Sequence, residues 1–322
     1  MSDEISSIKV VEREVTNQDF LFLKLQELKD KKISSLYLEI DEGPDLQEVD
    51  IDSTTLLDFL HTYCVTNKID KNLITIKSDN LSQDHVWPNY VKSFNATPFI
   101  HGQNLSFVPK KNIERKFGLF VGSSRWPRLD IGAYLYENYN DDTLLTFNHS
   151  NFKVEYYLKD IPIESHESIR KFYHNLPLRI KEENYNNGYI NWDKAYELLP
   201  CYNKFFLDIV CETWHEGKCF MPTEKIGRSL RSGTPFIVYG ARNFLLNLKQ
   251  LKFKTFGDFW DESYDQYEGQ ERIARLKLLI DYFGNKNKDE LYKLQEGVQS
   301  ICDHNLKIYQ SLNENAILKI FL

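Results

Sequence analysis

The sequence lacks any run of apolar residues that approaches the ~20 needed for a membrane-spanning helix. It is poor in sulfur, with five cysteines and two methionines among 322 residues. The cysteines form no CxxC pair and have no metal-ligand spacing. Their odd number, and a first segment that is acidic and polar rather than like a secretory signal, indicate reduced thiols. We therefore expect a cytoplasmic location, in a cell or in a virus-infected host.

Several motifs of nucleotide and hydrolase chemistry are also absent. The sequence contains no P-loop GxxxxGK[ST], no GxGxxG after its first predicted strand and no GxSxG. The acidic pair Asp141-Asp142 precedes a predicted strand and is typical of a turn, whereas a metal-binding DxD motif follows a strand. We therefore expect no metal site and no obligatory metal or cofactor.

The composition supports a well-packed globular protein. Apolar residues make up 42% of the chain, and 19 Tyr and 21 Phe argue against disorder. The length suits two domains of about 100–200 residues each. A formal net charge of −7 argues against a general nucleic-acid coat, although it is compatible with a local basic groove.

The first part of the chain predicts alternating helices and strands. Apolar residues at helical spacing predict a helix over Gln18–Lys31, and a cap at Asp52/Ser53 predicts another over Asp52–Asn67. Strands are predicted at Ile33–Ile40 and Leu73–Lys77. Strands separated by helices favour a parallel sheet, so residues 1–110 are expected to form a small Rossmann-like domain.

A charged connector, Lys110–Lys116, marks the predicted domain boundary. We expect a second Rossmann-like domain over 111–285 and a C-terminal helical segment over 286–322. The elements predicted after the connector are strands at Phe117–Val121 and Thr143–Phe147, and helices at Pro127–Tyr139, Trp192–Leu199, Arg242–Lys252, Glu271–Phe283 and Glu290–Leu312.

The stretch Phe205–Gly240 predicts a buried strand, a polar loop, a capped helix and a second strand. It places Glu212 at the end of the first strand, and Thr223, Glu224 and Lys225 at the start of the helix. Open α/β sheets bind ligands at the carboxyl ends of their strands, and a helix N-terminus attracts anions. Ordinary capping, with Thr223 as N-cap and Glu224 in the first turn, is the alternative interpretation.

This stretch resembles the donor-binding motif of fucosyltransferase-like glycosyltransferases. The resemblance rests on Glu212-Thr213, Thr223-Glu224-Lys225 and Gly233–Gly240, and it covers about residues 203–258. It implies the GT-B fold, with two facing Rossmann-like domains and parallel sheets. The N-terminal domain would be the acceptor side, and a nucleotide-diphosphate sugar would bind on the C-terminal domain. The resemblance also implies that Glu224 binds the ribose, that Lys225 faces the phosphates, and that the segment 286–322 packs back on the N-terminal domain. The sequence departs from the family pattern at Thr213, which replaces Asn.

A second candidate element is the turn Gly122-Ser123-Ser124-Arg125, which follows a predicted strand and opens a helix. Gly122 and Ser123 allow backbone N–H groups to approach a phosphate, and an arginine can clamp it bidentately. By the family resemblance, Arg125 contacts the donor diphosphate, with Arg128 as the second candidate. An ordinary strand–turn–helix corner is the alternative.

A metal-independent transferase also needs a carboxylate that takes the acceptor proton. Asp41 and Glu42 follow a predicted strand and are the candidate bases, with His85 and His101 as others. A solvated acidic loop is the alternative for the two carboxylates, and a surface or structural role is the alternative for the histidines.

These observations predict a glycosyltransferase that moves a sugar from a nucleotide-diphosphate sugar to an acceptor hydroxyl on a glycan or small molecule. One alternative is a phage-type transferase that acts on a hydroxylated base in DNA, with a basic surface at Lys110, Lys111, Arg115 and Lys116. A second alternative is a non-catalytic protein that binds a sugar nucleotide. The sequence leaves the donor, the acceptor and the oligomeric state open.

Overall fold

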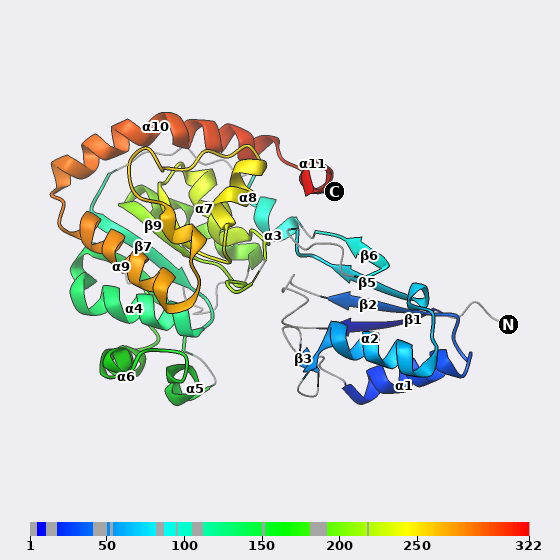
Figure 1. Ribbon diagram of the computed structural model, residues 1–322. Helices are drawn as coiled ribbons and strands as arrows, with labels where there is room; N and C mark the ends of the chain where they lie inside the picture. The colour runs from blue at the N-terminus through cyan, green and yellow to red at the C-terminus, as the bar shows by residue number, and fades with distance from the viewer. Residues whose placement is uncertain are drawn as a thin grey trace. The chain divides into compact units, whose positions relative to one another are not determined.

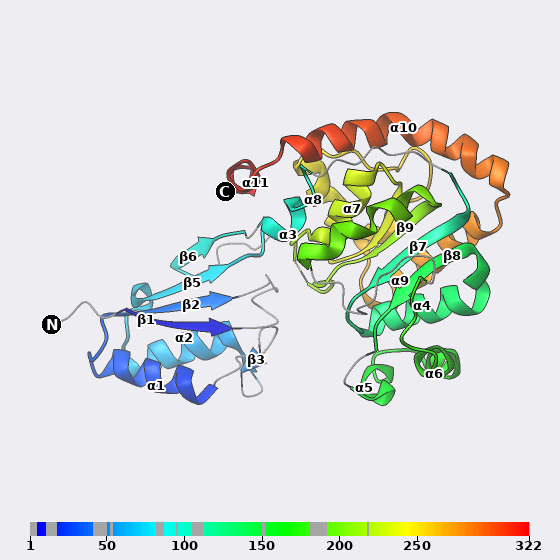
Figure 2. The same ribbon diagram turned by 180° about the vertical axis from the view of Figure 1, so that it is seen from behind.

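The computed structural model describes residues 5–10, 18–40, 50–51, 54–81, 87–94, 96–104, 112–149, 152–180, 192–217 and 219–321. The chain divides into two compact units (Figures 1 and 2). Unit 1 contains Met1–Asn95, Glu216–Met221 and Glu314–Leu322, and unit 2 contains Ala96–His215 and Pro222–Asn313. The first of the three segments of unit 1 thus ends at Asn95.

Unit 1 is built on a four-stranded parallel sheet with the order β1-β2-β5-β6. Its strands are β1 (Ile5–Val10), β2 (Ser35–Ile40), β5 (Ile74–Ser78) and β6 (Asn89–Lys92). The helices α1 (Gln18–Lys29) and α2 (Leu56–Asn67) cover one face (Figure 1). Side chains of β2 alternate between buried and half-buried, because successive residues of a strand point to opposite faces. The buried ones pack on apolar residues of both helices.

The start of α2 differs from the prediction. The helix begins at Leu56 rather than Asp52, after the short strands β3 (Asp50–Ile51) and β4 (Thr54–Thr55). Thr55 is the N-cap, and its hydroxyl accepts a hydrogen bond from the backbone N–H of Asp58 at 3.2 Å. Several residues near this point could cap a helix, so the sequence alone did not identify the right one.

Two segments that are distant in sequence complete unit 1. The backbone N–H of Leu81 donates to the carbonyl of Phe220 at 3.1 Å, and the Asn80 side chain accepts from the N–H of Phe220 at 3.0 Å. Helix α11 (Glu314–Phe321) packs Phe321 on Phe220, with ring centroids 5.4 Å apart. The C-terminal segment therefore forms two helices, of which α10 (Lys288–Ser311) belongs to unit 2 and α11 to unit 1.

Unit 2 contains a second parallel sheet, with the order β10-β9-β7-β8. Its strands are β7 (Arg115–Val121), β8 (Thr143–Phe147), β9 (Phe205–Cys211) and β10 (Phe236–Tyr239). The connection from β7 leads to β8 at one edge of the sheet, and the connection from β9 leads to β10 at the other edge. Right-handed crossovers therefore place α4 (Trp126–Asn138) and α7 (Glu224–Ser232) on opposite faces (Figure 2).

The remaining elements of unit 2 cover this sheet and its edges. Helix α9 (Gly269–Gly284) packs on α4, and α10 packs on α7. The other helices are α3 (Thr97–Ile100), α5 (Val154–Leu158), α6 (His166–His174), α8 (Phe244–Gln250) and a 3₁₀ segment at Trp192–Asn203. Within the described ranges, no helix is long and apolar enough to cross a bilayer.

The predicted strand–loop–helix–strand stretch is confirmed. Helix α7 has Thr223 as its N-cap and ends at Gly233, whose φ of 60° is the left-handed conformation that glycine adopts readily. The strands on either side, the central strand β9 and the edge strand β10, are completely buried, as expected for a sheet that is covered on both faces. The overall fold is thus mixed α/β with parallel sheets, as predicted.

Candidate functional site

The candidate site lies at the carboxyl ends of β7 and β9, where the strand order of the second sheet reverses. Connections from two neighbouring strands leave in opposite directions at such a point, which opens a crevice that binds ligands in many α/β proteins. The loop after β7 carries Gly122–Arg125, and the loop after β9 carries Glu212 and leads to the start of α7. The two candidate elements found in the sequence therefore follow neighbouring strands.

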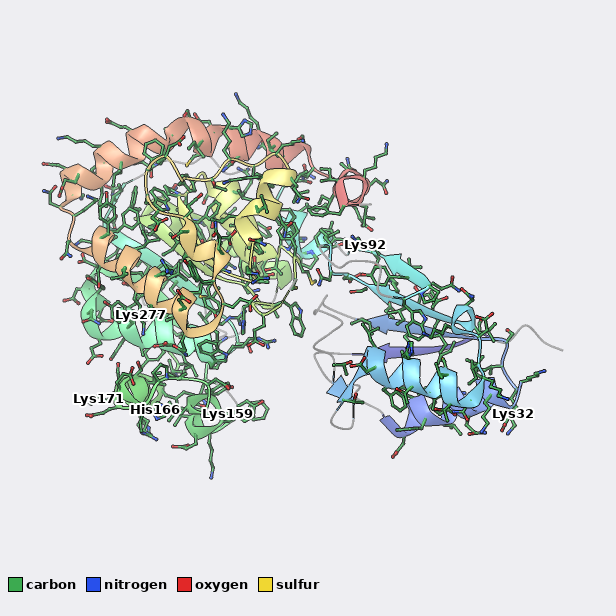
Figure 3. All side chains as sticks on the ribbon, viewed as in Figure 1. Lys32, Lys92, Lys159, His166, Lys171 and Lys277 are labelled. Atoms are coloured by element: carbon green, nitrogen blue, oxygen red, sulfur yellow. The ribbon has the colours of Figure 1, made fainter. Side chains whose placement is uncertain are left out.

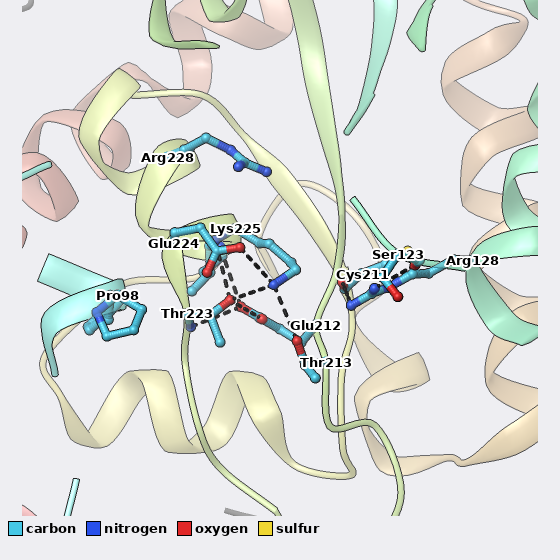
Figure 4. Close-up of polar contacts among 12 residues, drawn as sticks. Pro98, Ser123, Arg128, Cys211, Glu212, Thr213, Thr223, Glu224, Lys225 and Arg228 are labelled. Carbon is cyan, nitrogen blue, oxygen red and sulfur yellow. Dashed lines mark hydrogen bonds and ion pairs between the residues drawn. The ribbon is translucent and has the colours of Figure 1, made fainter. Parts of the chain in front are cut away.

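Glu212 holds the first turn of α7 in place (Figure 4). One carboxylate oxygen accepts hydrogen bonds from the backbone N–H groups of Thr223, at 3.3 Å, and Ile226, at 3.4 Å. The other accepts from the Thr223 hydroxyl at 2.5 Å. Glu212 is only 1% exposed, and burial raises the pKa of its carboxyl. Both oxygens are already occupied, so Glu212 positions the helix start rather than facing a ligand.

Lys225 and Glu224 lie at the tip of the same helix. The Lys225 ammonium donates to Glu224 at 2.8 Å, to the Thr223 hydroxyl at 3.1 Å and to the Thr213 hydroxyl at 3.3 Å. The side chains of Lys225 and Glu224 are 14% and 13% exposed, respectively. Thr213 thus supplies an oxygen to this cluster. The lysine lies within reach of an incoming anion and is held by neutral hydroxyls and one carboxylate.

Glu224 remains ionised over the whole physiological pH range. Burial of its carboxyl opposes ionisation, but the neighbouring charges of Lys225 and Arg228 outweigh this effect and lower its pKa to about 2. The helix N-terminus also favours a negative charge at this position. A permanently ionised carboxylate can accept hydrogen bonds from ligand hydroxyls.

The turn after β7 is fixed by Asn148, which follows β8. The Asn148 amide donates to the carbonyl of Gly122 at 2.9 Å, and its backbone carbonyl accepts from the Ser124 hydroxyl at 3.3 Å. Ser123, in contrast, is exposed. The turn is therefore preorganised, which lowers the entropy cost of binding a ligand there.

Arg128 joins the two loops. It is 3% exposed, and its terminal nitrogens donate to the backbone carbonyls of Ser123 at 2.8 Å and Cys211 at 3.1 Å (Figure 4). Burial, together with the nearby charge of Arg125, lowers the pKa of Arg128 to about 10. Arg128 therefore adds positive charge and positions the β7 turn against the end of β9.

Arg125 is the more accessible of the two arginines. Its guanidinium carbon lies 5.6 Å from the centre of the Trp214 ring, a cation–π distance. No carboxylate within the described part of the chain forms an ion pair with Arg125 or Arg128. Uncompensated guanidinium groups beside a glycine–serine turn favour a phosphate or a carboxylate ligand.

The structure adds Arg228, which sequence reasoning missed. It lies one helical turn after Glu224 on the same face of α7, and it is 4% exposed. Its Nε donates to the Tyr202 hydroxyl at 2.9 Å, and its terminal nitrogens have no hydrogen-bond partner in the described ranges. Interaction with Tyr202 and Glu224 outweighs burial and raises the pKa of Arg228. Its i+4 spacing from Glu224 was the available signal.

An aromatic cluster borders the same edge of the sheet. Trp126, His215 and Tyr239 have ring centroids 5.4–6.2 Å apart and follow or end three different strands. Their contact depends on strand order, so the sequence did not reveal it. Tyr239 and His215 are buried, so the partly exposed Trp126 is the ring of this cluster against which a nucleobase could stack.

Some sequence predictions are not addressed by this geometry. Asp41, Glu42 and His85 lie outside the described residues, as do Lys110 and Lys111. His101 is exposed in the turn after α3, with its ring centroid 5.9 Å from that of Tyr196. In the part of the chain that is described, no group of three or more His, Cys, Asp or Glu side chains could hold a metal ion.

Two surface cavities of about 400 and 430 Å³ lie elsewhere in unit 2. One is lined by residues of α9 and the segment before it, including Trp260 and Leu278. The other is lined by residues between β8 and the end of α6, including His149 and Arg170. The residues at the ends of β7 and β9 line neither cavity, so the site rests on side-chain chemistry and strand topology.

A scan against protein-family models finds no match, and a search of curated proteins finds no relative of significant similarity.

Proposed function

We propose that the protein is a metal-independent glycosyltransferase of the GT-B type that uses a nucleotide-diphosphate sugar as donor. The observation that carries the proposal is the composition of the switch point in unit 2. Among the described residues, four cationic side chains, Arg125, Arg128, Lys225 and Arg228, lie near it together with three carboxylates, Glu212, Glu224 and Asp208. The surplus of positive charge favours an anionic ligand. The Glu224 carboxylate remains available to accept hydrogen bonds from hydroxyl groups of that ligand.

The donor diphosphate would occupy the turn after β7 and the tip of α7. Backbone N–H groups at Gly122 and Ser123, the Arg125 guanidinium and the Lys225 ammonium would contact its oxygens. Lys225 would exchange its hydroxyl contacts, at 3.1 and 3.3 Å, for a phosphate. Arg228 would contribute through its terminal nitrogens, for which the described residues supply no hydrogen-bond acceptor.

The nucleoside would lie on the β9–β10 side of this turn. Glu224 would accept hydrogen bonds from the ribose hydroxyls, since it is ionised and partly accessible. The base would stack on Trp126, which is partly exposed and is backed by the buried rings of His215 and Tyr239. Glu212 would act only as a positioning residue through the first turn of α7.

In the proposed reaction, the acceptor oxygen bonds to the anomeric carbon while the bond from that carbon to the phosphate oxygen breaks. The leaving diphosphate keeps the electron pair, and its charge is stabilised by Lys225 and Arg125. The acceptor proton passes to a carboxylate, for which Asp41 and Glu42 remain the sequence-based candidates. Loss of one such leaving-group cation is expected to cost about 3 kcal/mol of transition-state stabilisation.

A thermal-shift screen tests the donor-binding part of this proposal. The ligands are UDP-, GDP- and dTDP-sugars, with a CMP-sugar as the single-phosphate comparison. A diphosphate ligand at about 100 times its Kd should stabilise the folded protein by about 2.7 kcal/mol. The same ligand should leave the melting temperatures of Glu224→Gln and Lys225→Met nearly unchanged. Matched controls are Glu296→Gln and Lys293→Met, because both side chains are exposed on α10.

Binding without sugar transfer or hydrolysis would favour the non-catalytic alternative. No stabilisation by any sugar nucleotide, or equal stabilisation of wild type and both α7 variants, would contradict the proposal. Salt-dependent binding of duplex DNA would instead favour the transferase that acts on a modified base.

A further inference from the structure

The cavity of about 430 Å³ in unit 2 is a candidate for a second ligand site. It lies between the end of β8 and the two short helices that follow, α5 and α6. Its volume falls within the range of about 300–1,000 Å³ that is typical of small-molecule sites. We call it the His149 cavity, after the residue that links it to β8.

Basic side chains dominate the lining. Two cationic side chains, Lys153 and Arg170, and two imidazoles, His149 and His174, line the cavity with a single carboxylate, that of Glu155. Arg170 and Glu155 approach only to 3.8 Å, with 46% and 63% of their side chains exposed. An exposed pair at this distance contributes at most about 1 kcal/mol and is easily replaced by an anionic ligand.

Aromatic faces supply the rest of the surface. Tyr173 and Phe152 line the cavity, and Phe152 stacks on Tyr156 with ring centroids 4.8 Å apart at an angle of 21°. Phe152 and Tyr156 are 58% and 52% exposed. A pair of stacked, exposed rings beside basic groups matches a ligand that combines a negative charge with an apolar face. Sugar acids and sugar phosphates have this combination, since the C–H groups of a pyranose form an apolar face.

The position of the cavity relates it to the candidate donor site. His149 follows Asn148, which holds the turn at Gly122 through a hydrogen bond of 2.9 Å. In the sheet, β7 lies between β9 and β8. The proposed nucleoside position at β9 and β10, the proposed diphosphate position at the turn after β7, and the His149 cavity at the end of β8 therefore follow one another across the sheet.

We propose that the His149 cavity binds a sugar that carries a carboxylate or a phosphate. Arg170 and Lys153 would bind the anionic group, and Tyr173 and Phe152 would contact the sugar ring. Binding itself does not require a nucleotide, so it can be tested separately.

The test measures binding of three probes by saturation-transfer NMR in the absence of nucleotide. Glucuronate carries a carboxylate, glucose 6-phosphate carries a phosphate, and glucose is the neutral control. Wild type should bind one or both anionic sugars at least tenfold more tightly than glucose. Arg170→Gln and Lys153→Gln should each weaken that binding about tenfold, as expected for loss of one charge-assisted hydrogen bond.

Lys171→Gln is the matched control. Lys171, labelled in Figure 3, lies next to Arg170 on α6 but does not line the cavity, and it pairs with Glu167 at 2.8 Å. The Lys171→Gln variant should bind the anionic sugars with the same affinity as wild type. Equal affinity for glucose and both anionic sugars, or equal loss in Arg170→Gln and Lys171→Gln, would overturn the inference. If the cavity binds an anionic sugar but no sugar nucleotide binds the protein, the proposed function fails while the second site stands.

Discussion

Replacement of Glu224 by glutamine tests whether this carboxylate stays ionised in the folded protein. Its pKa is about 2 in the folded state, compared with an ordinary value of 4.5. At about 1.4 kcal/mol for each pKa unit, the ionised group stabilises the protein by about 3 kcal/mol at neutral pH. As the pH falls, the unfolded chain takes up the proton first. The stabilisation is therefore present above about pH 4.5 and is lost as the pH falls towards 2.

Glu224→Gln should remove this pH dependence and conserve the shape of the side chain. The variant should be less stable than wild type by up to about 3 kcal/mol at pH 7, and the difference should shrink towards zero near pH 2. Urea unfolding followed by tryptophan fluorescence is a suitable assay, because four of the five tryptophans belong to unit 2. Burial raises the pKa of Glu212, and the charge of Glu224 raises it further, so Glu224→Gln should also bring the pKa of Glu212 closer to its ordinary value.

Glu296→Gln on α10 controls for the loss of a carboxylate in general, since Glu296 is exposed. It should leave the unfolding free energy unchanged within about 0.5 kcal/mol at any pH. A difference between wild type and Glu224→Gln that stays constant from pH 7 to pH 3 would refute the reasoning. It would mean that Lys225 and Arg228 do not hold the carboxylate in its ionised form.

Three further substitutions test the scaffold of the site. Arg272→Met should destabilise the protein by about 3–5 kcal/mol in urea unfolding, because it leaves Asp265, its partner at 2.8 Å, buried without a counter-charge. Asn148→Ala should weaken binding of a nucleoside diphosphate in calorimetry with a small change in melting temperature, because it frees the turn at Gly122; unchanged affinity would exclude this role. Gly227→Ala should lower the melting temperature, since a Cβ atom there would lie 2.4 Å from a tyrosine hydroxyl and 2.7 Å from a backbone carbonyl.

Local patterns in the sequence predicted the central part of unit 2 well. The strand at Phe205, the N-cap at Thr223 and the helix end at Gly233 depend on neighbouring residues, and the structure confirms all three. The parallel arrangement of both sheets follows from helices that alternate with strands. Such features are determined within a few residues of each other, so a single sequence is sufficient to find them.

Features that depend on distant pairing were not found. The sequence does not show that Phe220 bonds with Asn80 and Leu81, because hydrogen bonds between distant loops leave no periodic signal. For the same reason, the two oxygens of Glu212 could not be assigned to the start of α7. The region of α5 and α6, which forms the His149 cavity, was not predicted either, since short helices of one or two turns carry little periodicity.

Calorimetric titration of a nucleoside diphosphate into wild type and Arg125→Gln tests the central claim most directly. Arg275→Gln is the matched control, because Arg275 lies on α9 and pairs with Glu271 at 3.0 Å. The account predicts one binding site, an affinity about tenfold lower in Arg125→Gln, and wild-type affinity in Arg275→Gln. No binding to wild type, or the same affinity in all three proteins, would contradict the assignment of an anion site to the ends of β7 and β9.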